Sequence, residues 1–464
     1  MARTDKALDT AESSANIYDL VVIGTGQGGS APITKCRQAG WRVAVIDDEP
    51  FGGTCALRGC DPKKVLVGAA DLVAWQQRMK DHGVAGESRI AWPALMRFKE
   101  SFTESVPANR ESTLEQLGIV TLHGQARFIS RGRLAVGDRE LRTKHVVVAA
   151  GAKPQRLDIP GEELLCSSTE FLDLPDLPRH IVFVGAGYIS FEFAHIAARA
   201  GAIVTMIARK PLSEFDRTLV DRLVGHTREI GIDVRLDTDV VGIERIRSGG
   251  SFRVACTKDG VRSSVDADLV VHGAGRVPAT ANLDVGRGAV QVDERGAIVV
   301  NEYMQSVTNP LVYAAGDVTL PPGKRPLTPV AAHEGAIVAS NLVRGNTKRP
   351  NYLGTPSVVF TIPPLASVGL TEHEARALGV DVDIKSEDTA AWYSNRRTRT
   401  PVGTFKTIVD AASGRLLGAH LLGDRADEAI NLFGLAIRLG IPAAELKHAI
   451  YAYPTTGSDL PYML

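Results

Sequence analysis

The hydrophobic pattern of the chain is dominated by a strand–turn–helix–strand unit that occurs twice. The first copy, "YDLVVIGTGQGGSAPITKCRQAGWRVAVID", passes from an apolar strand into a glycine turn and a helix, and its second apolar strand ends at Asp47. The second copy, "HIVFVGAGYISFEFAHIAARAGAIVTMIARK", repeats this order. Apolar strands that alternate with helices are typical of α/β folds, so the pattern predicts two Rossmann-like domains.

Each copy carries a glycine fingerprint between its first strand and its helix. The fingerprint positions are Gly24, Gly26 and Gly29 in the first copy and Gly185, Gly187 and Ser190 in the second. The first glycine makes a tight turn, the second lets a pyrophosphate approach the backbone, and the third lets helix and strand pack closely. The two fingerprints predict two bound dinucleotides, one at each helix N-terminus.

The residue after the second strand indicates which dinucleotide each copy binds. Asp47 stands where a carboxylate accepts hydrogen bonds from a ribose, which favours an adenosine with an unmodified 2′-hydroxyl. The second copy has Arg209 and Lys210 at this place, and two cations suit a 2′-phosphate. We therefore favour NADPH over NADH; the alternative is that these two cations are a solvated surface pair.

The rest of the pattern adds crossing turns and a further domain. Apolar stretches at 146–154, 269–278 and 311–318 end in small-residue turns, the form in which a chain passes close to a cofactor or between domains. From about residue 350 onward, short strands alternate with helical stretches and no glycine fingerprint occurs, which predicts a separate α+β domain.

Composition narrows the class of protein. The 464 residues balance 53 Lys and Arg against 53 Asp and Glu, which gives no electrostatic argument for a nucleic-acid or membrane partner. No apolar run is long enough for a membrane span, and residues 1–16 are polar, so we expect a loose tail there. Five cysteines in so long a chain do not form a secreted disulfide framework, and we expect a cytoplasmic protein.

The stretch "GGTCALRGCDPKK" places Cys55 and Cys60 directly after the first nucleotide-binding unit. A zinc site would need further ligands from afar, because no second cysteine pair or histidine lies close by in sequence. Five residues of regular helix rise about 7.5 Å, more than the roughly 4.4–6.8 Å between Cα atoms that a disulfide accepts. A bridge would need a distorted helix start, and strained bridges are the labile, catalytic ones, which favours a redox centre.

These motifs together resemble the FAD-dependent pyridine nucleotide-disulfide oxidoreductases, of the glutathione, mercuric, trypanothione and dihydrolipoamide reductase type. The resemblance covers about residues 18–464 and includes "YAAGDV" and the terminal domain. It implies FAD on the first unit and NADPH on the second. The cofactor-binding candidates are Gly24, Gly26, Gly29, Asp47, Gly53, Thr54, Gly151, Asp317, Thr328, Gly185, Gly187, Tyr188, Arg209, Lys210 and Gly275.

The resemblance also implies the catalytic roles. Cys60 would lie next to the flavin, and Cys55 would be the interchange thiol that attacks the substrate. Lys63 would stand by flavin N5, paired with Glu192, and Tyr188 would be the aromatic gate that moves aside for the nicotinamide. A nearby lysine and a helix N-terminus would both stabilise a thiolate, which is the form that attacks a disulfide.

The chain departs from the family near its C-terminus. Relatives place a His-Pro-Thr…Glu run there, contributed by the partner subunit, whereas this chain reads "YAYPTTGSDL". Tyr453 takes the histidine's place, Ser458 falls where the glutamate is expected, and Asp459 follows. His448 lies upstream, on a predicted helix. A tyrosine titrates near 10, so it is a poor base at neutral pH although it can donate a proton.

Two further departures concern charge and metal delivery. Arg58 and Asp61 occupy loop positions that relatives fill with uncharged residues, and they have opposite effects on a nearby thiolate. Mercuric reductases also lack the histidine, but they carry a C-terminal cysteine pair, and this chain has no cysteine after Cys256. The stretch 395–400, "NRRTRT", is either a cationic rim for an anionic substrate or a solvated loop.

The leading interpretation is an NADPH-dependent disulfide reductase that passes electrons through FAD and the Cys55–Cys60 pair to a disulfide or a sulfur or metal-thiol acceptor. The alternatives are a quinone or metal-ion reductase that uses the flavin, and a binding protein with relic chemistry. The expected domains are an FAD domain at 17–152 and 273–345, an NADPH domain at 153–272, and a dimerisation domain at 350–464. We expect a homodimer whose site is completed by Tyr453 of the partner subunit.

Overall fold

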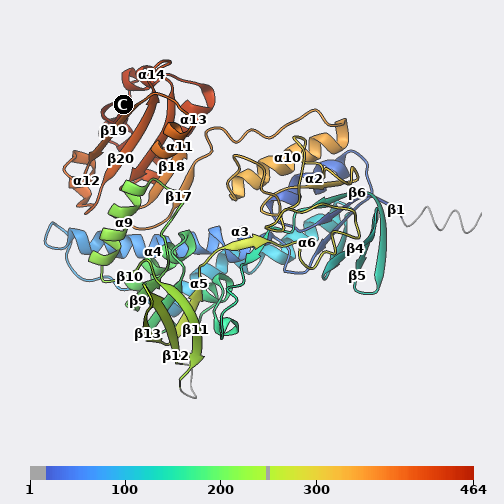
Figure 1. Cartoon of the computed structure of the whole chain (residues 1–464), viewed down its shortest axis with the longest axis horizontal. Coiled ribbons are helices and arrows are strands. Elements are labelled where there is room, and N and C mark those ends of the chain that lie inside the picture. The colour runs from blue at the N-terminus through green and yellow to red at the C-terminus, as the bar shows by residue number, and fades with distance from the viewer. Residues whose placement is uncertain (1–16, 247–250) are drawn as a thin grey trace, which may run out of the picture. The chain divides into compact units, whose positions relative to one another are not determined.

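The computed structural model describes residues 17–246 and 251–464, so the tail expected at 1–16 lies outside the described residues. The chain divides into two compact units, each built from three segments (Figure 1). Unit 1 comprises Met1–Pro62, Glu100–Gln155 and Arg276–Tyr352, and unit 2 comprises Lys63–Lys99, Arg156–Gly275 and Leu353–Leu464. Among the described residues, no helix has the length and apolar character needed to cross a membrane.

A seven-stranded sheet forms the centre of unit 1. Its order is β3-β2-β1-β6-β5-β4, with β16 also paired to β6. Strands β3, β2, β1, β6 and β16 run parallel to one another. Strand β5 pairs antiparallel with both β6 and β4. The bounds are β1 (Ile17–Ile23), β2 (Val43–Asp47), β3 (Val120–His123), β4 (Ala126–Ser130), β5 (Arg133–Val136), β6 (Arg139–Val148) and β16 (Val312–Ala314).

Both faces of this sheet are buried, because its central strands are apolar at successive positions. Leu20 and Val22 face one core cluster, while Val21 and Ile23 face another. Helices α2 (Gln27–Gln38) and α10 (Thr328–Arg344) contribute Ile33 and other apolar side chains to the first cluster, and Figure 1 shows these helices side by side. The strands therefore have the continuous apolar character of a parallel sheet covered on both sides.

The remaining elements of unit 1 lie around this sheet. A two-stranded antiparallel ribbon pairs β7 (Ala152–Pro154) with β15 (Arg276–Pro278). The helices that complete unit 1 are α3 (Gly53–Arg58) and α6 (Val106–Gln116). Two helices cross from one unit into the other, α4 (Cys60–Met79) and α5 (Trp92–Thr103).

Unit 2 contains the sheet that carries the second glycine fingerprint. It is a parallel four-stranded sheet in the order β10-β9-β8-β14 and is accompanied by an antiparallel sheet, β11-β12-β13. The strands are β8 (His180–Val184), β9 (Ile203–Ile207), β10 (Asp233–Arg235), β11 (Asp239–Arg245), β12 (Phe252–Lys258), β13 (Val261–Ala267) and β14 (Leu269–His272). The helical elements are η1 (Glu162–Leu164), α7 (Ser168–Leu172), α8 (Tyr188–Arg199) and α9 (Arg217–Glu229).

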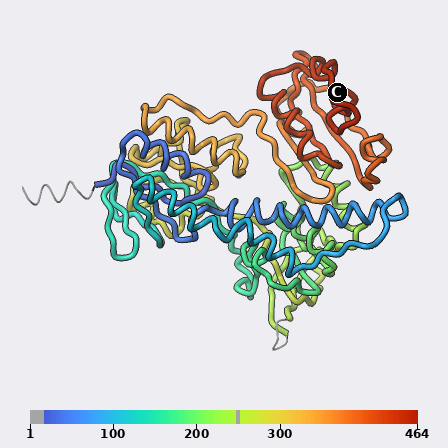
Figure 2. The backbone as a smooth tube through the Cα atoms, turned by 180° about the vertical axis from the view of Figure 1, so that it is seen from behind, coloured from blue at the N-terminus to red at the C-terminus, as the bar shows by residue number. Residues whose placement is uncertain are grey.

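The C-terminal part of unit 2 is the expected α+β domain, the red part of the tube in Figure 2. Its five antiparallel strands have the order β17-β18-β21-β20-β19. These strands are β17 (Ser357–Val359), β18 (Leu365–Gly369), β19 (Val382–Asp388), β20 (Thr404–Asp410) and β21 (Leu416–Leu422). The helical elements are α11 (Glu372–Ala377), α12 (Tyr393–Thr398), α13 (Ala426–Leu439), α14 (Ala443–His448), η2 (Thr456–Asp459) and α15 (Leu460–Met463).

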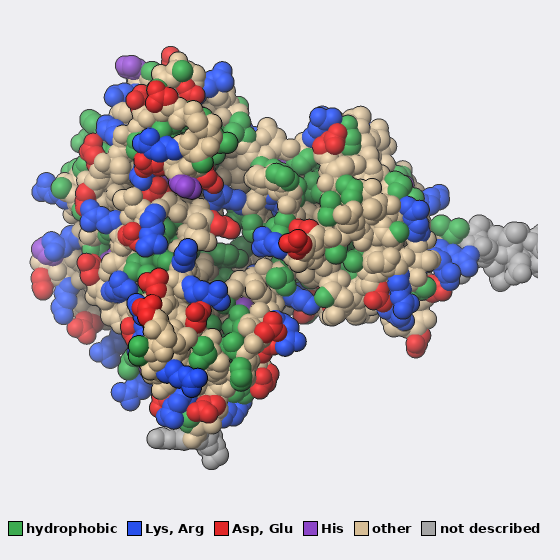
Figure 3. All heavy atoms as spheres, viewed as in Figure 1, with side chains coloured by type: hydrophobic (Ala, Val, Ile, Leu, Met, Phe, Trp, Pro, Cys, Tyr) green, Lys and Arg blue, Asp and Glu red, His purple; other side chains and the backbone are tan. Residues whose placement is uncertain are grey.

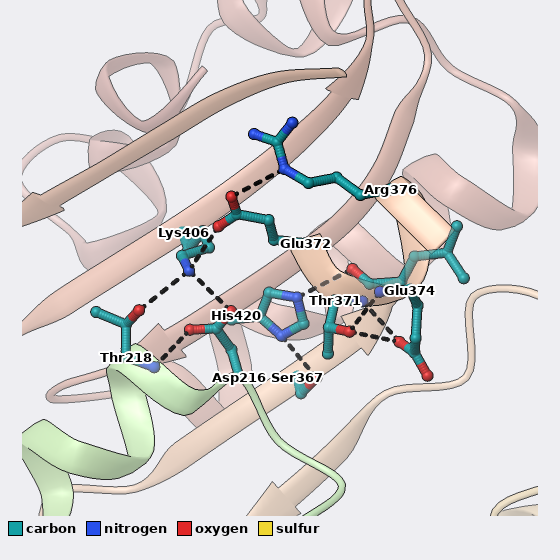
Figure 4. Close-up of polar contacts among 10 residues, drawn as sticks. Asp216, Thr218, Ser367, Thr371, Glu372, Glu374, Arg376, Lys406 and His420 are labelled. Carbon is teal, nitrogen blue, oxygen red and sulfur yellow. Dashed lines mark hydrogen bonds and ion pairs between the residues drawn. The ribbon is translucent and has the colours of Figure 1, made fainter. Parts of the chain in front are cut away.

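A buried ion cluster links α9 to this C-terminal sheet inside unit 2 (Figure 4). Lys406 of β20 donates to Asp216, which caps α9, over 2.9 Å, and to Glu372 over 3.1 Å. Lys406 is 7% exposed, so its charge needs these partners. Although burial lowers the pKa of Lys406, its bonds to Asp216 and Glu372 outweigh burial and raise it, so the ammonium stays charged.

The sequence expectation of two Rossmann-like domains and a C-terminal α+β domain is confirmed. Lysine, arginine and acidic side chains are interspersed over the face that Figure 3 shows, as the balanced composition suggests. The expected domain limits remain a prediction, because division into compact units groups the nucleotide-binding segment 156–275 with the C-terminal domain.

Candidate active site

The predicted redox pair, Cys55 and Cys60, lies at the junction of two helices in unit 1. Cys55 belongs to the short helix α3, Gly59 follows with φ −145° and ψ −114°, and Cys60 begins α4. A Cβ at Gly59 would lie 2.8 Å from the carbonyl oxygen of Thr54, so only glycine fits this break. The expected distortion of the helix is therefore present, as a break between the two cysteines.

The two cysteines carry thiols that contact each other and Thr328. Cys55 is half-buried and Cys60 is exposed, and the Sγ of Cys60 lies 3.3 Å from Thr328 Oγ1 at the start of α10. A hydrogen bond with Cys60, together with burial, raises the pKa of the Cys55 thiol, and Thr328 partly opposes this shift. Thr328, expected near the flavin, thus also hydrogen-bonds with the redox pair.

Arg58 and Asp61, the two charged residues beside the cysteines, differ in their effect on the Cys55 thiol. Asp61 accepts a hydrogen bond from the Cys55 thiol over 3.7 Å, and its negative charge further raises the pKa of Cys55. Arg58 instead pairs with Glu49, at 3.6 Å. The acid therefore opposes the Cys55 thiolate directly, whereas the arginine is held by another carboxylate.

The first fingerprint forms a backbone cradle in unit 1. Gly24 has φ +101°, and a Cβ there would lie 2.2 Å from the carbonyl oxygen of Ala149. A Cβ at Gly29 would lie 2.4 Å from the carbonyl oxygen of Gly24. Around Gly26 the nearest such contact is 3.8 Å, from Gly53, so this position leaves room for a ligand. Helix α2 has no side-chain cap and no acid in its first turn, which suits a pyrophosphate at its N-terminus.

Asp47 supports the glycine turn as well as offering a carboxylate. Its Oδ2 accepts from the backbone N–H of Thr25 at 2.8 Å and from the Thr25 hydroxyl at 2.6 Å. Thr25 Oγ1 in turn accepts from the backbone N–H of Gly52. Hydrogen bonds therefore connect Asp47, the predicted partner of the ribose, to the fingerprint and to the segment that leads to the cysteines.

A buried ion pair supports the turn that carries Asp317, and sequence analysis missed it. Lys324 donates to Glu334 at 2.9 Å and to the carbonyl oxygen of Gly316 at 2.6 Å, and the ion-paired side chains are both 0% exposed. Glu334 also accepts from the Gly316 N–H at 2.7 Å. Burial raises the pKa of Asp317, and Lys324 opposes this shift. Lys324 lies before α10, ten positions ahead of Glu334, and no helical periodicity relates the two residues.

The second fingerprint builds a similar cradle in unit 2. Gly185 has φ +100°, and a Cβ there would lie 2.4 Å from the carbonyl oxygen of Gly273. Ser190, in the third place, is buried, and its hydroxyl has no hydrogen-bond partner among the described residues. The glycine that permits close packing here is Gly273, because a Cβ at that position would lie 1.9 Å from Ser190 Oγ. Helix α8, which follows Gly187, lacks a side-chain cap and a first-turn acid.

The predicted phosphate-binding cations lie on the surface of unit 2. Arg209 pairs with Asp239 at 2.6 Å, and its side chain is 83% exposed. Lys210 is also exposed. The acidic partner of Arg209 would compete with a 2′-phosphate, so the preference for NADPH rests on both cations acting together.

Unit 2 also contains the predicted pair of Lys63 and Glu192. Lys63, in the first turn of α4, forms an ion pair with Glu192 of α8, which is 0% exposed. Tyr188, the first residue of α8, has its ring centroid 5.7 Å from Lys63 Nζ. The three residues that the resemblance assigned to the nicotinamide and flavin side therefore do meet in the structure.

Tyr453, the remaining catalytic candidate, projects from the C-terminal segment and is 80% exposed. Ser458 bonds within its own turn, to Thr455, and Asp459 accepts from Ser394. His448 ends α14 and contacts the carbonyl oxygen of Ala444 over 2.8 Å. Among the described residues, neither Ser458 nor Asp459 forms a hydrogen bond with the Tyr453 hydroxyl.

Within residues 17–246 and 251–464, no group of three or more His, Cys, Asp or Glu side chains could hold a metal ion. Of the remaining cofactor-binding candidates, Gly53 and Thr54 begin helix α3, whereas Gly151 and Gly275 lie outside helices and strands. Gly53, Gly151 and Gly275 have φ of +78°, +71° and +113°, and these positive angles explain glycine at each of the three positions.

Comparison with known proteins gives consistent matches over nearly the whole chain. The sequence model of the family described as pyridine nucleotide-disulphide oxidoreductase matches residues 18–335, and that of its dimerisation domain matches residues 355–463. Glutathione reductase of Burkholderia cepacia is 31% identical over 448 residues, which cover 95% of this chain and 97% of that one. Mercuric reductase of Lysinibacillus sphaericus is 29% identical, covering 96% of this chain and 81% of that one.

Solved structures give the same picture. The Cu(II) complex of the HOCl-induced flavoprotein disulfide reductase RclA from Escherichia coli superposes with a TM-score of 0.84 and 30% identity, covering 97% of this chain and 99% of that one. The expected cofactors, FAD and NADPH, agree with these relatives, because glutathione and mercuric reductases use both. The two uncapped helix N-termini and their glycine cradles fit two dinucleotides.

Proposed function

Because this chain belongs to the pyridine nucleotide-disulphide oxidoreductase family, we propose that it is an NADPH-dependent reductase whose final electron donor is the Cys55–Cys60 dithiol. Its acceptor is a small disulfide, or another sulfur or metal-thiol species, that does not need a histidine for exchange. The observation that carries this proposal is the contact of two thiols at a helix break, next to Thr328.

The dithiol can reduce a disulfide in two exchanges. The Cys55 thiolate attacks one substrate sulfur, forms a mixed disulfide and releases the other substrate half as a thiolate, which takes up a proton. The Cys60 thiolate then attacks the Cys55 sulfur, releases the second half and leaves a Cys55–Cys60 disulfide. Two electrons from NADPH restore the dithiol, so one NADPH and one proton are consumed for each disulfide that becomes two thiols.

The chain's own residues prepare the cofactors and the charges. FAD, when bound, supplies hydride acceptance and electron transfer to a disulfide, a chemistry that side chains lack. Gly24, Gly26 and Gly29 would hold its pyrophosphate, and Asp317 would face its polar chain. Lys63, paired with Glu192, would place its positive charge beside the flavin. Tyr188 would cover the nicotinamide position until NADPH arrives.

Proton transfer to the departing thiolate is assigned to Tyr453 of the partner subunit. The family match to the dimerisation domain supports a homodimer. A phenol can donate a proton or a hydrogen bond but cannot act as a base at neutral pH. We therefore expect glutathione disulfide to be a slow substrate and acceptors with better leaving groups to be faster.

A metal-ion reductase is the second candidate. It is favoured by the mercuric reductase relatives and by the Cu(II) complex of RclA, whose fold this chain shares. Two thiols at a helix break suit a soft ion such as Hg(II), and they suit the Cu(I) that forms when Cu(II) takes up one electron. The same dithiol would then bind the metal ion as substrate, while the electrons would come from the flavin.

Anaerobic NADPH oxidation by the FAD-loaded protein tests the proposal. The acceptors are glutathione disulfide, other small disulfides, a quinone, and Cu(II) or thiol-bound Hg(II), each with the wild-type protein and with Cys55→Ser. A matched control is Cys256→Ala, because Cys256 is a buried thiol of strand β12 that the proposal does not use. FAD content is measured for every variant.

We expect at least one disulfide to turn over, Cys55→Ser to lose this turnover while retaining FAD, and Cys256→Ala to keep it. Metal-ion turnover that needs Cys55, without disulfide turnover, would select the second candidate. Quinone or metal turnover that survives Cys55→Ser, with every disulfide inactive, would contradict the dithiol mechanism.

A further inference from the structure

One face of helix α8 holds a neighbouring stretch of backbone in unit 2. Glu192, His195 and Arg199 are spaced three and four residues apart, so they lie on the same face of α8. All three side chains hydrogen-bond to the backbone of the segment 360–362, which follows strand β17. Sequence analysis assigned a role only to Glu192.

The contacts are specific to backbone groups. Glu192 Oε1 accepts from the N–H of Phe360 at 2.8 Å, and His195 Nδ1 accepts from the N–H of Ile362 at 3.1 Å. Arg199 Nη2 donates to the carbonyl oxygen of Ile362 at 3.1 Å. His226 of α9 contacts the same carbonyl oxygen at 3.1 Å. The backbone of Ile362 is therefore bonded at both its donor and its acceptor.

The tautomer of His195 follows from its second contact. Its Nε2 lies 3.0 Å from the Thr227 hydroxyl, which itself donates to the carbonyl oxygen of Leu223 at 2.7 Å. Since that hydroxyl proton is already committed, Nε2 carries the imidazole proton and Nδ1 is the acceptor. His195 is 0% exposed, so a neutral ring with both nitrogens bonded is the form that suits this site.

We propose that His195 and Arg199 are positioning residues for the Lys63–Glu192 pair, and this rests on the proposed function of that pair. They fix Ile362, which fixes Phe360 two residues earlier, and the Phe360 N–H holds one oxygen of Glu192. The other oxygen of Glu192 is thereby directed to Lys63, with which it forms the ion pair. Precise placement of Lys63 matters because small displacements at a reacting centre reduce rates strongly.

A double-mutant cycle on the rate of flavin reduction by NADPH tests this proposal. The variants are Glu192→Gln, His195→Leu and the double variant, measured anaerobically by stopped-flow absorbance. His195→Asn retains an acceptor near the Nδ1 position and should restore most of the rate. FAD content and the thermal unfolding midpoint are recorded for each variant.

His420→Leu is the matched control. His420, in strand β21, is also a buried histidine (Figure 4). Its two ring nitrogens bond to Ser367 and to the carbonyl oxygen of Leu370. Both of these partners lie outside the 360–362 segment. A general loss of stability should affect His195→Leu and His420→Leu alike, whereas loss of positioning should slow flavin reduction only in the former.

We expect His195→Leu to slow flavin reduction roughly tenfold, and the double variant to be hardly slower than Glu192→Gln alone, because residues of one network are not additive. Effects that multiply in the double variant would overturn the positioning role. If Glu192→Gln itself leaves flavin reduction unchanged, the assigned role of the Lys63–Glu192 pair fails, and this inference fails with it.

Where His195→Leu yields no folded protein, the cycle is repeated with Arg199→Lys, which retains the charge but loses the planar donor geometry. Its expected effect is a three- to tenfold slower reduction that is again not additive with Glu192→Gln. Full additivity in this second cycle would equally contradict the proposal.

Discussion

At the scale of single residues, the pKa of the Cys55 thiol depends on which neighbouring groups contact the sulfurs. Arg58 and Asp61 both flank the cysteines in sequence, and their opposite charges left the net effect undecided. The structure separates them, because Arg58 pairs with Glu49 whereas Asp61 bonds to Cys55. Side-chain direction at a break between two helices depends on neighbouring segments, and a single sequence contains no pattern that fixes it.

Asp61→Asn should make Cys55 a better nucleophile. Removal of the carboxylate charge lowers the pKa of the Cys55 thiol, because Asp61 is one of the groups that raises it. We expect the NADPH-reduced variant to be alkylated by iodoacetamide several-fold faster at pH 7, with the pH midpoint shifted downward. Arg58→Gln serves as the control, and an equal shift in that variant would contradict the assignment to Asp61.

Tyr453→His should improve exchange with ordinary disulfides. An imidazole titrates near neutral pH and can both accept and donate the proton, which a phenol cannot do at pH 7. We expect the rate with glutathione disulfide to rise at least tenfold, a typical lower size for general acid–base catalysis. An unchanged rate, with dimer and FAD content intact, would show that Tyr453 only fills space.

At the scale of elements, the glycine turns between strand and helix were predictable and the side chains that support them were not. Glycine spacing between a strand and a helix is a local signal, so Gly24 and Gly185 could be assigned from sequence. The pair of Lys324 and Glu334 joins a loop to the middle of α10, and no periodicity connects them. His195 lies in a helix of mostly apolar residues, and its acceptor role depends on a backbone N–H some 170 residues away, which no local pattern indicates.

Lys324→Met should weaken FAD binding. The substitution leaves Glu334 buried at 0% exposure without its cation, and the Gly316–Asp317 turn loses the ammonium that bonds to it. Breaking a buried pair costs about 3–5 kcal/mol, and we expect at least a tenfold weaker FAD affinity by fluorescence titration of the apoprotein. Lys324→Met with Glu334→Gln should recover part of this loss, and no recovery would argue against the pair as the cause.

At the scale of the whole molecule, buried histidines tie stability to pH. Burial, followed by the charge of Arg199, lowers the pKa of His195 well below its ordinary value, and the same causes lower that of His226. The unfolded chain therefore binds more protons than the folded one below about pH 6.5. Stability should fall as the pH is lowered through this value and be fully present above it.

Urea denaturation at pH 7.5 and 5.5 measures this effect. Each buried neutral histidine contributes at most about 1.4 kcal/mol per pH unit, so we expect a lower urea midpoint at pH 5.5. His195→Asn should reduce the difference between the two pH values, whereas His448→Asn, on the exposed end of α14, should not. An equal pH difference in all three proteins would contradict the role of His195.

The pairing of β16 with β6 determines how late in synthesis the sheet of unit 1 can be completed. The FAD sheet receives this strand, Val312–Ala314, only after the second nucleotide-binding segment has been synthesised, and α10 with Thr328 follows later still. A nascent chain leaves the ribosome from its N-terminus, so the flavin site is completed after most of the chain has emerged. Until then Cys60 lacks its Thr328 partner, and both thiols are carried by a polypeptide whose flavin site is incomplete.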